Sequence, residues 1–148
     1  MGLKEKLIED LKNSMKSGDK LRTETIRMLR AQILEFEKSG IGREINAEDD
    51  LKILLSSVKK RKDSIEMFAN ANRFDLVEKE TKELEIVQAY LPKQMTKEDA
   101  EVVIAKIITE SGATTSKDFG KVMPLVMKEL KGKVNGKLIT EIVKLKLS

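Results

Sequence analysis

The residues best suited to chemistry lie in the last third of the chain, where a glycine precedes a lysine three times. These pairs are Gly120-Lys121, Gly132-Lys133 and Gly136-Lys137. N–H groups and partial positive charge at a helix start favour a bound phosphate, and glycine lets the backbone approach it closely. Lysine ammonium groups would pair with phosphates without reading a base sequence. The candidate RNA-binding residues are therefore Lys117, Gly120, Lys121, Lys128, Lys131, Lys133, Gly136, Lys137 and Lys144.

A plainer interpretation of the same segment stays open. Lysines around a small core can serve solubility alone, and glycines often mark helix ends. Asn135 followed by Gly136 is also ordinary capping chemistry at a helix start.

A second basic group precedes this segment. Its members are Lys59, Lys60, Arg61, Lys62 and Arg73. Neighbouring residues on a helix point about 100° apart, so four successive cations cannot form one patch unaided. The alternative is a solvated helix balanced by nearby acids.

Two carboxylates, Glu80 and Glu83, lie one helical turn apart and could hold a metal, but no histidine or aspartate is near to complete such a site. A structural role is favoured instead. In that case Arg73 pairs with a carboxylate, and Tyr90 fastens the two parts of the chain together.

Composition excludes much catalytic chemistry. The 148 residues contain no cysteine and no histidine, so thiol nucleophiles, Cys/His zinc sites and histidine bases are absent. We predict no catalytic residue, no cofactor and no metal site. The net charge is +4, and residues 96–148 hold ten lysines against seven acids. The absence of tryptophan argues against stacking on unpaired bases.

The elements that must position these residues all show helical periodicity, which predicts an all-α protein. Helix starts are indicated at Asp19, Asn46, Thr96 and Asn135. Pro92 predicts a helix end at Leu91. We expect an N-terminal helical bundle over residues 1–94, with the second to fourth helices antiparallel and the first packed on them. A small three-helix module follows over residues 95–148.

Three details of this prediction concern single positions. Leu3, Leu7, Leu11 and Met15 form the apolar stripe of the first helix. Pro124 should lie in the first turn of a helix that begins near Gly120, where no backbone N–H is required. No apolar run reaches the roughly 20 residues of a membrane span, and the start lacks a signal-peptide pattern. We therefore predict a cytoplasmic protein without a membrane partner.

Several spaced motifs together resemble the GatB/YqeY family. The residues that carry the resemblance are Arg73-Phe74-Asp75-Leu76, Glu80, Glu83-Leu84, Tyr90-Leu91-Pro92-Lys93-Gln94, Ser116 to Met123, and Gly136-Lys137-Leu138 to Lys144. The resemblance covers essentially the whole chain. The chain is similar both to the stand-alone bacterial members and to the tail of the B subunit of the aminoacyl-tRNA amidotransferase.

This resemblance implies a helical bundle, a three-helix domain and a tRNA-binding role. The ATP and magnesium site of the amidotransferase and its serine–lysine machinery have no counterpart here, so the resemblance does not transfer ligase activity. Our leading hypothesis is an accessory protein that binds tRNA or another structured RNA. The second is an adaptor that binds a protein through apolar residues such as Met123, Val126 and Met127. An amidotransferase-type enzyme acting on aminoacyl-tRNA has the least support in the side chains.

Overall fold

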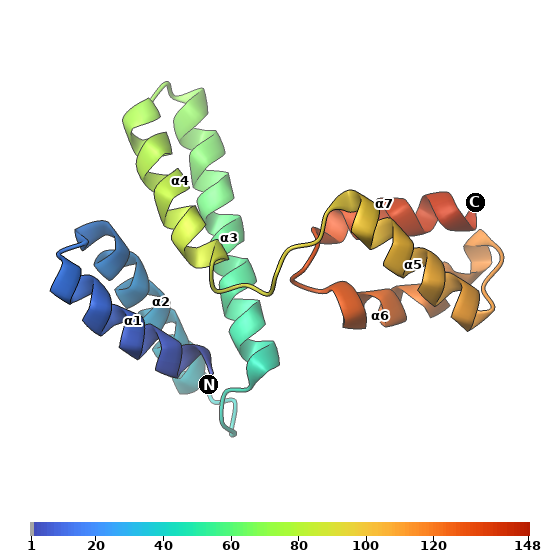
Figure 1. Ribbon diagram of the computed structural model, residues 1–148, viewed down its shortest axis with the longest axis horizontal. Helices are drawn as coiled ribbons and strands as arrows, with labels where there is room; N and C mark the ends of the chain where they lie inside the picture. Colours follow the sequence, from blue (N-terminus) through green and yellow to red (C-terminus); the bar gives the residue numbers. More distant parts are fainter. Residues whose placement is uncertain (1) are drawn as a thin grey trace. The chain divides into compact units, whose positions relative to one another are not determined.

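The computed structural model describes residues 2–148, in which every regular element is a helix (Figure 1). This confirms the all-α fold class. The contacts divide the chain into an N-terminal unit that ends at Leu91 and a C-terminal unit that begins at Pro92. The domain boundary predicted after residue 94 stays a prediction.

The N-terminal unit consists of two helical hairpins. Helix α1 (Leu3–Ser17) pairs with α2 (Lys20–Lys38), and α3 (Ala47–Asn70) pairs with α4 (Phe74–Gln88) (Figure 1). Helix α2 also contacts α3 and α4, but less extensively. The N-terminal unit is thus a helical bundle, as expected, in which α2 contacts both α3 and α4 and α1 packs on α2.

Local side-chain chemistry sets the starts of α2 and α3 as predicted. Asp19 accepts a hydrogen bond from the Arg22 N–H at 3.1 Å. At the start of α3, Asn46 and Asp49 each accept the other's backbone N–H at 3.0 Å, which makes a reciprocal capping box. Helix α1 is followed by Gly18 as its C-cap, whose φ of 75° suits glycine.

The core of the N-terminal unit is aliphatic. Its buried members are Leu3, Leu7, Ile26, Leu29, Ile33, Ile53, Leu54, Val58 and Val87. Met15, which we had placed on the apolar stripe of α1, is instead 56% exposed. A repeat of four residues drifts about 40° per step around a helix, so its fourth member has left the buried face. Ser14 takes that place and accepts a hydrogen bond from the Thr23 hydroxyl at 2.9 Å.

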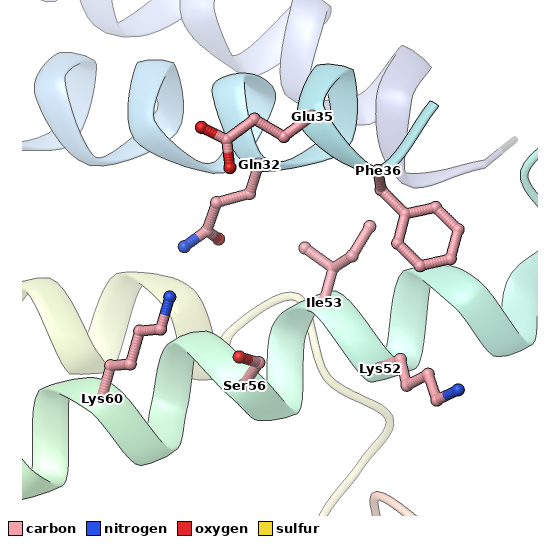
Figure 2. Close-up of a pocket in the computed structure, with 7 residues that line it drawn as sticks. All are labelled: Gln32, Glu35, Phe36, Lys52, Ile53, Ser56 and Lys60. Atoms are coloured by element: carbon pink, nitrogen blue, oxygen red, sulfur yellow. The ribbon is translucent and has the colours of Figure 1, made fainter. Parts of the chain in front are cut away.

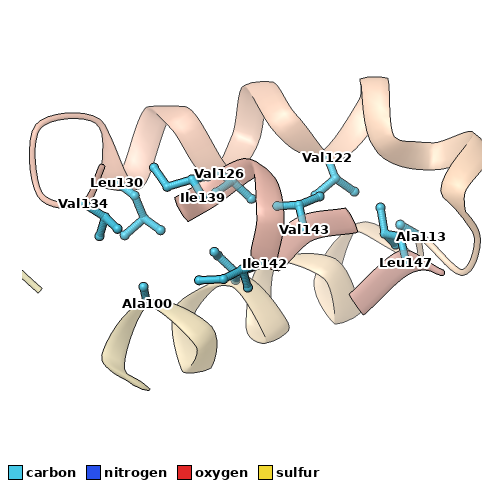
Figure 3. Packing of buried hydrophobic residues seen from close by; sticks show 11 residues of the cluster. Ala100, Ala113, Val122, Val126, Leu130, Val134, Ile139, Ile142, Val143 and Leu147 are labelled. Atoms are coloured by element: carbon cyan, nitrogen blue, oxygen red, sulfur yellow. The ribbon is translucent and has the colours of Figure 1, made fainter. Parts of the chain in front are cut away.

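The C-terminal unit packs α5 (Lys97–Ser111), the 3₁₀ helix η1 (Ser116–Asp118), α6 (Phe119–Leu130) and α7 (Gly136–Leu147) around one core (Figure 3). Valine and isoleucine side chains of α6 and α7 pack together there, with Ala100 of α5 below them. Ile104 of α5 is buried in the same core. Thr96 caps α5 by accepting the Asp99 N–H at 3.2 Å, as predicted.

Two expectations about the prolines were wrong. Helix α4 ends at Gln88 because the Tyr90 and Leu91 N–H groups donate to carbonyls three residues back, which tightens the chain before Pro92. Pro124 lies inside α6, and not in its first turn, because η1 leads directly into a helix that begins at Phe119. Its missing N–H leaves the Gly120 carbonyl without the usual intrahelical donor.

Candidate nucleic-acid interface

Three of the lysines predicted to bind RNA lie at the surface of η1 and α6. Lys117, Lys121 and Lys128 are all exposed. Lys121 and Lys128 lie seven residues apart and thus on the same side of α6, with Leu125 between them. Leu125 is 45% exposed, so this surface, which we call the α6 lysine face, combines cations with an apolar contact.

The carboxylate of Asp118, the residue before α6, is a negatively charged group at the start of this helix. The Asp118 carboxylate accepts the N–H groups of Thr114 at 2.9 Å and Thr115 at 3.3 Å. These two hydrogen bonds, with help from nearby Lys121, lower the pKa of Asp118. The Phe119 N–H donates to the Ser116 carbonyl. The Asp118 carboxylate therefore places a negative charge close to Lys121 at the start of α6.

A rigid turn positions the next two lysines. Lys131 and Lys133 are half-buried in the connection from α6 to α7, on either side of Gly132, whose φ is 83°. The Met95 N–H donates to the Lys133 carbonyl at 2.9 Å, and the Gln94 amide donates to the Gly132 carbonyl at 2.6 Å. The segment before α5 therefore fixes the backbone that carries both ammonium groups.

The start of α7 carries the remaining candidates. Asn135 caps the helix by accepting the Lys137 N–H at 2.8 Å, as predicted. Gly136 is the first residue of α7 and is exposed. Lys137 and Lys144 share one face, with Glu141 between them at spacings of four and three residues. That carboxylate offsets part of their charge, as Asp118 does near Lys121 of the α6 lysine face.

Lysines outnumber acidic residues in the C-terminal unit. Among residues 2–148, no ion pair within 4.0 Å involves a lysine of this unit. Its ammonium groups are therefore available to an external polyanion.

The second basic group includes one residue that was assigned wrongly. Arg61 is only 5% exposed, and its guanidinium forms ion pairs with Glu83 and Glu80. The distance to the Glu80 carboxylate is 3.3 Å. The sulfur of Met28 lies 3.0 Å from the other terminal nitrogen of Arg61. Arg61 therefore joins α2, α3 and α4 inside the N-terminal unit and offers nothing to RNA. It also occupies the two carboxylates that could have held a metal.

The other residues of this group lie at the surface. Arg73 binds Asp75 through two hydrogen bonds of 3.2 and 3.1 Å, which confirms the expected pairing with a carboxylate. Lys59 and Lys62 share one exposed face of α3. Lys60 lines a groove between α2 and α3 (Figure 2).

Tyr90, which we expected to fasten the two parts of the chain, makes its hydrogen bond within the N-terminal unit. Its hydroxyl donates to the Asp10 carboxylate at 2.5 Å, so it joins the end of the α4 segment to α1 within the N-terminal unit. Burial first, and then this hydrogen bond, raise the pKa of Tyr90.

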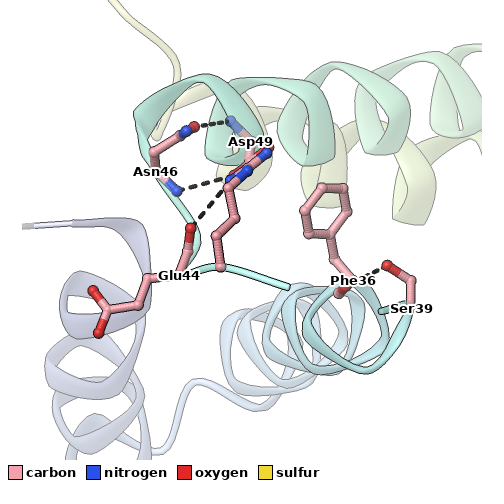
Figure 4. A network of polar contacts seen from close by, with 6 residues as sticks. Phe36, Ser39, Glu44, Asn46 and Asp49 are labelled. Carbon is pink, nitrogen blue, oxygen red and sulfur yellow. Dashed lines mark hydrogen bonds and ion pairs between the residues drawn. The ribbon is translucent and has the colours of Figure 1, made fainter. Parts of the chain in front are cut away.

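The loop before α3 holds a polar network that the sequence analysis missed. Arg43 donates to both Asp49 oxygens, at 2.5 and 3.0 Å, and to the Glu44 carbonyl at 3.1 Å (Figure 4). The Arg43 hydrogen bond and then the Asn46 N–H lower the pKa of Asp49 to about 2. The capping signature around Asn46 was visible in the sequence, but the arginine that completes it was not.

Residues 2–148 contain no cluster of three or more acidic side chains suited to a metal ion. None of the helices in this range is both long and apolar enough to cross a membrane.

Comparison with known proteins identifies the family. The profile of the Yqey-like protein family matches residues 4–147. The chain belongs to this family. It is 35% identical to altered inheritance of mitochondria protein 41, mitochondrial, of Pyrenophora tritici-repentis, over 86% of this chain and 71% of that protein. Its namesake in Lachancea thermotolerans is 39% identical over 70% of this chain and 57% of the relative. The protein of the same name in Kluyveromyces lactis is 32% identical over 70% of this chain and 57% of that relative.

Proposed function

We propose that this Yqey-like protein is an RNA-binding accessory protein whose C-terminal unit contacts the phosphates of a structured RNA. The observation that supports this most directly is the α6 lysine face, defined by Lys117, Lys121 and Lys128, continued by the fixed lysines of the following turn. All three are exposed, and no carboxylate among the described residues forms an ion pair with them.

The proposed RNA is tRNA. The resemblance of the C-terminal motifs to the tail of the amidotransferase B subunit supports this choice. Contact through ammonium groups alone carries no base sequence information, so selectivity would come from the shape of the RNA. Helices with a defined turn between them provide a surface of fixed shape for this purpose.

The experiment is fluorescence anisotropy of labelled total tRNA titrated with the purified protein, at low and at physiological salt. We expect micromolar binding that weakens as salt rises, because each neutralised phosphate releases counterions. The decisive variant carries Lys117→Glu, Lys121→Glu and Lys128→Glu, which should abolish binding.

A matched control makes the same change of charge elsewhere in the unit, with Lys93→Glu, Lys97→Glu and Lys106→Glu. This control should retain most of the affinity. The proposal fails if tRNA does not bind at low salt. It fails equally if both triple variants lose the same affinity, because the effect would then report net charge and no defined face.

The adaptor residues named from the sequence are not available to a partner, because Val126 is buried and Met123 and Met127 pack against the core of the C-terminal unit. Other apolar side chains that are exposed favour a protein-binding adaptor as the second candidate. Val102 on α5 is 71% exposed and Leu145 on α7 is 75% exposed. Binding through such side chains would change little with salt and would be lost in Val102→Asp or Leu145→Asp. The same substitutions should leave tRNA binding intact, which separates the two functions.

The cytoplasmic location stays a prediction. The names of the fungal relatives assign those proteins to mitochondria. RNA binding through the α6 lysine face would be compatible with either compartment.

A further inference from the structure

The groove between α2 and α3 lies outside everything that the proposed function uses, because it belongs to the N-terminal unit (Figure 2). It has a volume of about 380 Å³. The surface combines charged, polar and apolar side chains of two neighbouring helices. Those that bear on its binding properties are Glu35 and Phe36 of α2 and Lys52, Ile53, Ser56 and Lys60 of α3.

Two lysines of α3 mark the length of this groove. Lys52 and Lys60 lie eight residues apart, which corresponds to about 12 Å along the helix. Figure 2 shows them on either side of Ser56. Both are exposed, and neither forms an ion pair within 4.0 Å with any of residues 2–148. A ligand that follows the groove would therefore meet an ammonium group near each end.

The groove also has an apolar part. Ile53 belongs to the core of the N-terminal unit, and the half-buried Phe36 packs against the same core. Figure 2 shows the two side chains next to each other, with Lys52 beside Phe36. Because the core holds these side chains in place, an apolar group that covered Phe36 would lose its contact with water without first having to order the surface.

Glu35 favours an acidic protein segment over RNA as the ligand. It is exposed, and its carboxylate forms no ion pair within 4.0 Å among the described residues. A nucleic acid carries a negative charge on every phosphate, so it would place charge near this carboxylate and gain little from Phe36. A peptide can instead place acids opposite the lysines, an apolar residue over Phe36 and a neutral or basic residue near Glu35.

The walls of the groove indicate the form of such a peptide. Both walls are helices, whose backbone groups are hydrogen-bonded within each helix, so an extended strand finds no edge to pair with. A helix that ran alongside α3 would have the same rise per residue. Its carboxylates would match the separation of Lys52 and Lys60 if they lay seven or eight residues apart. An apolar residue three or four positions after the first acid lies on the same face.

We propose that this groove is a docking surface for an amphipathic helix of a partner protein. The helix carries two acidic residues seven or eight positions apart, with an apolar residue between them on the same face. Its carboxylates pair with Lys52 and Lys60, and its apolar side chain covers Phe36. Exposed ion pairs contribute little each and the groove is open, so the expected dissociation constant is on the order of 100 μM.

The experiment begins with a phage-display selection of helical peptides on the purified protein. Peptides of about 14 residues provide four helical turns, enough to span both lysines. We expect enrichment of sequences that contain the spaced acids around an apolar residue. An enriched peptide is then synthesised, labelled and titrated by fluorescence anisotropy. The same peptide with glutamine at both acidic positions should bind at least about tenfold more weakly.

Matched variants test the protein side. Lys52→Glu with Lys60→Glu reverses both charges of the groove and should weaken peptide binding at least about tenfold. Ser56→Trp keeps both lysines but fills the space between them, and it should block binding. Lys59→Glu with Lys62→Glu makes the same change of charge on exposed lysines of α3 that do not line the groove, so it should retain the affinity. Circular dichroism verifies that each variant is folded.

The proposal is overturned if the selection enriches no acidic peptide, or if both charge-reversed variants lose the same affinity. Anisotropy with labelled tRNA distinguishes the other polyanion, and the Lys52→Glu, Lys60→Glu variant should bind tRNA as the wild type does. A loss of tRNA binding in this variant alone would assign the two lysines to RNA and overturn the docking surface. Because the groove lies in the N-terminal unit, none of these results replaces the test of the α6 lysine face.

Discussion

The guanidinium of Arg61 on α3 donates to the carboxylate of Glu83 on α4, and both side chains are buried. The second acceptor is Glu80, one turn earlier on α4, and Met28 of α2 completes the surroundings. A single cation therefore holds three helices together and separates two carboxylates that would otherwise repel each other.

Replacing Arg61 should be among the most destabilising single changes in the N-terminal unit. Arg61→Met would leave Glu83 buried without a counter-charge, a situation that costs about 3–5 kcal/mol of unfolding free energy. Urea unfolding followed by circular dichroism measures this. Combining Arg61→Met with Glu83→Met should recover much of the loss, because no buried charge then remains. Equal midpoints for Arg61→Met and the wild type would show that the pair does not contribute.

Asp49 gives the stability a defined acid dependence. Its pKa in the folded protein is lowered from 3.8 to about 2, first by the hydrogen bond from Arg43 and then by the Asn46 N–H. A carboxyl group whose pKa is lowered by folding stabilises the folded state at pH values above its pKa in the unfolded chain. This stabilisation is lost as the pH falls toward the pKa in the folded protein. Asp49→Asn should therefore lower the melting temperature at neutral pH, and the difference from wild type should shrink between about pH 4 and pH 2. A difference that stays constant over this range would exclude the ion pair as its cause.

The hydrogen bond from the Tyr90 hydroxyl to the Asp10 carboxylate separately stabilises the packing of α1. A hydrogen bond to a charged acceptor contributes about 1.5–3 kcal/mol, so Tyr90→Phe should loosen α1 by a similar amount. Hydrogen exchange of the α1 amides would report this as lost protection. The amides of α5 to α7 serve as the internal control. If α1 protection is unchanged, the contact does not hold the helix.

Helix starts were predictable because their chemistry is local. At Asp19, Asn46, Thr96 and Asn135, the capping side chain and the N–H that it accepts lie two or three residues apart. No knowledge of tertiary packing is required to recognise such a pair.

The role of Arg61 was missed because the sequence analysis grouped it with its charged neighbours. Its position follows Leu54 and Val58 at spacings of seven and three residues, and both are buried, so the same periodicity placed it on the inner face. Its partner Glu83 lies 22 residues away on another helix. Such pairings, like the groove between α2 and α3, depend on which helices meet and not on local pattern.

Gly132 should be intolerant of a side chain. Its φ of 83° is a left-handed conformation that costs roughly 1–2 kcal/mol for other residues, and its turn fixes Lys131 and Lys133. Gly132→Ala should lower the melting temperature of the protein in calorimetry. Gly120→Ala is the matched control, because Gly120 lies within α6 with open space around it and alanine is the better helix former. The control should be neutral or stabilising, and equal losses in both variants would contradict the argument.

The α6 lysine face should set the salt dependence of RNA binding. Each phosphate neutralised contributes about 0.7–0.9 to the slope of log affinity against log salt concentration. Replacing Lys121 and Lys128 by glutamine should therefore reduce this slope by about 1.5, while also weakening binding at low salt. Glutamine at Lys97 and Lys106 removes the same charge from α5 and should leave the slope nearly unchanged. If both double variants keep the wild-type slope, neither face contacts phosphate. An equal reduction in both would instead indicate a diffuse attraction to the net charge of the unit.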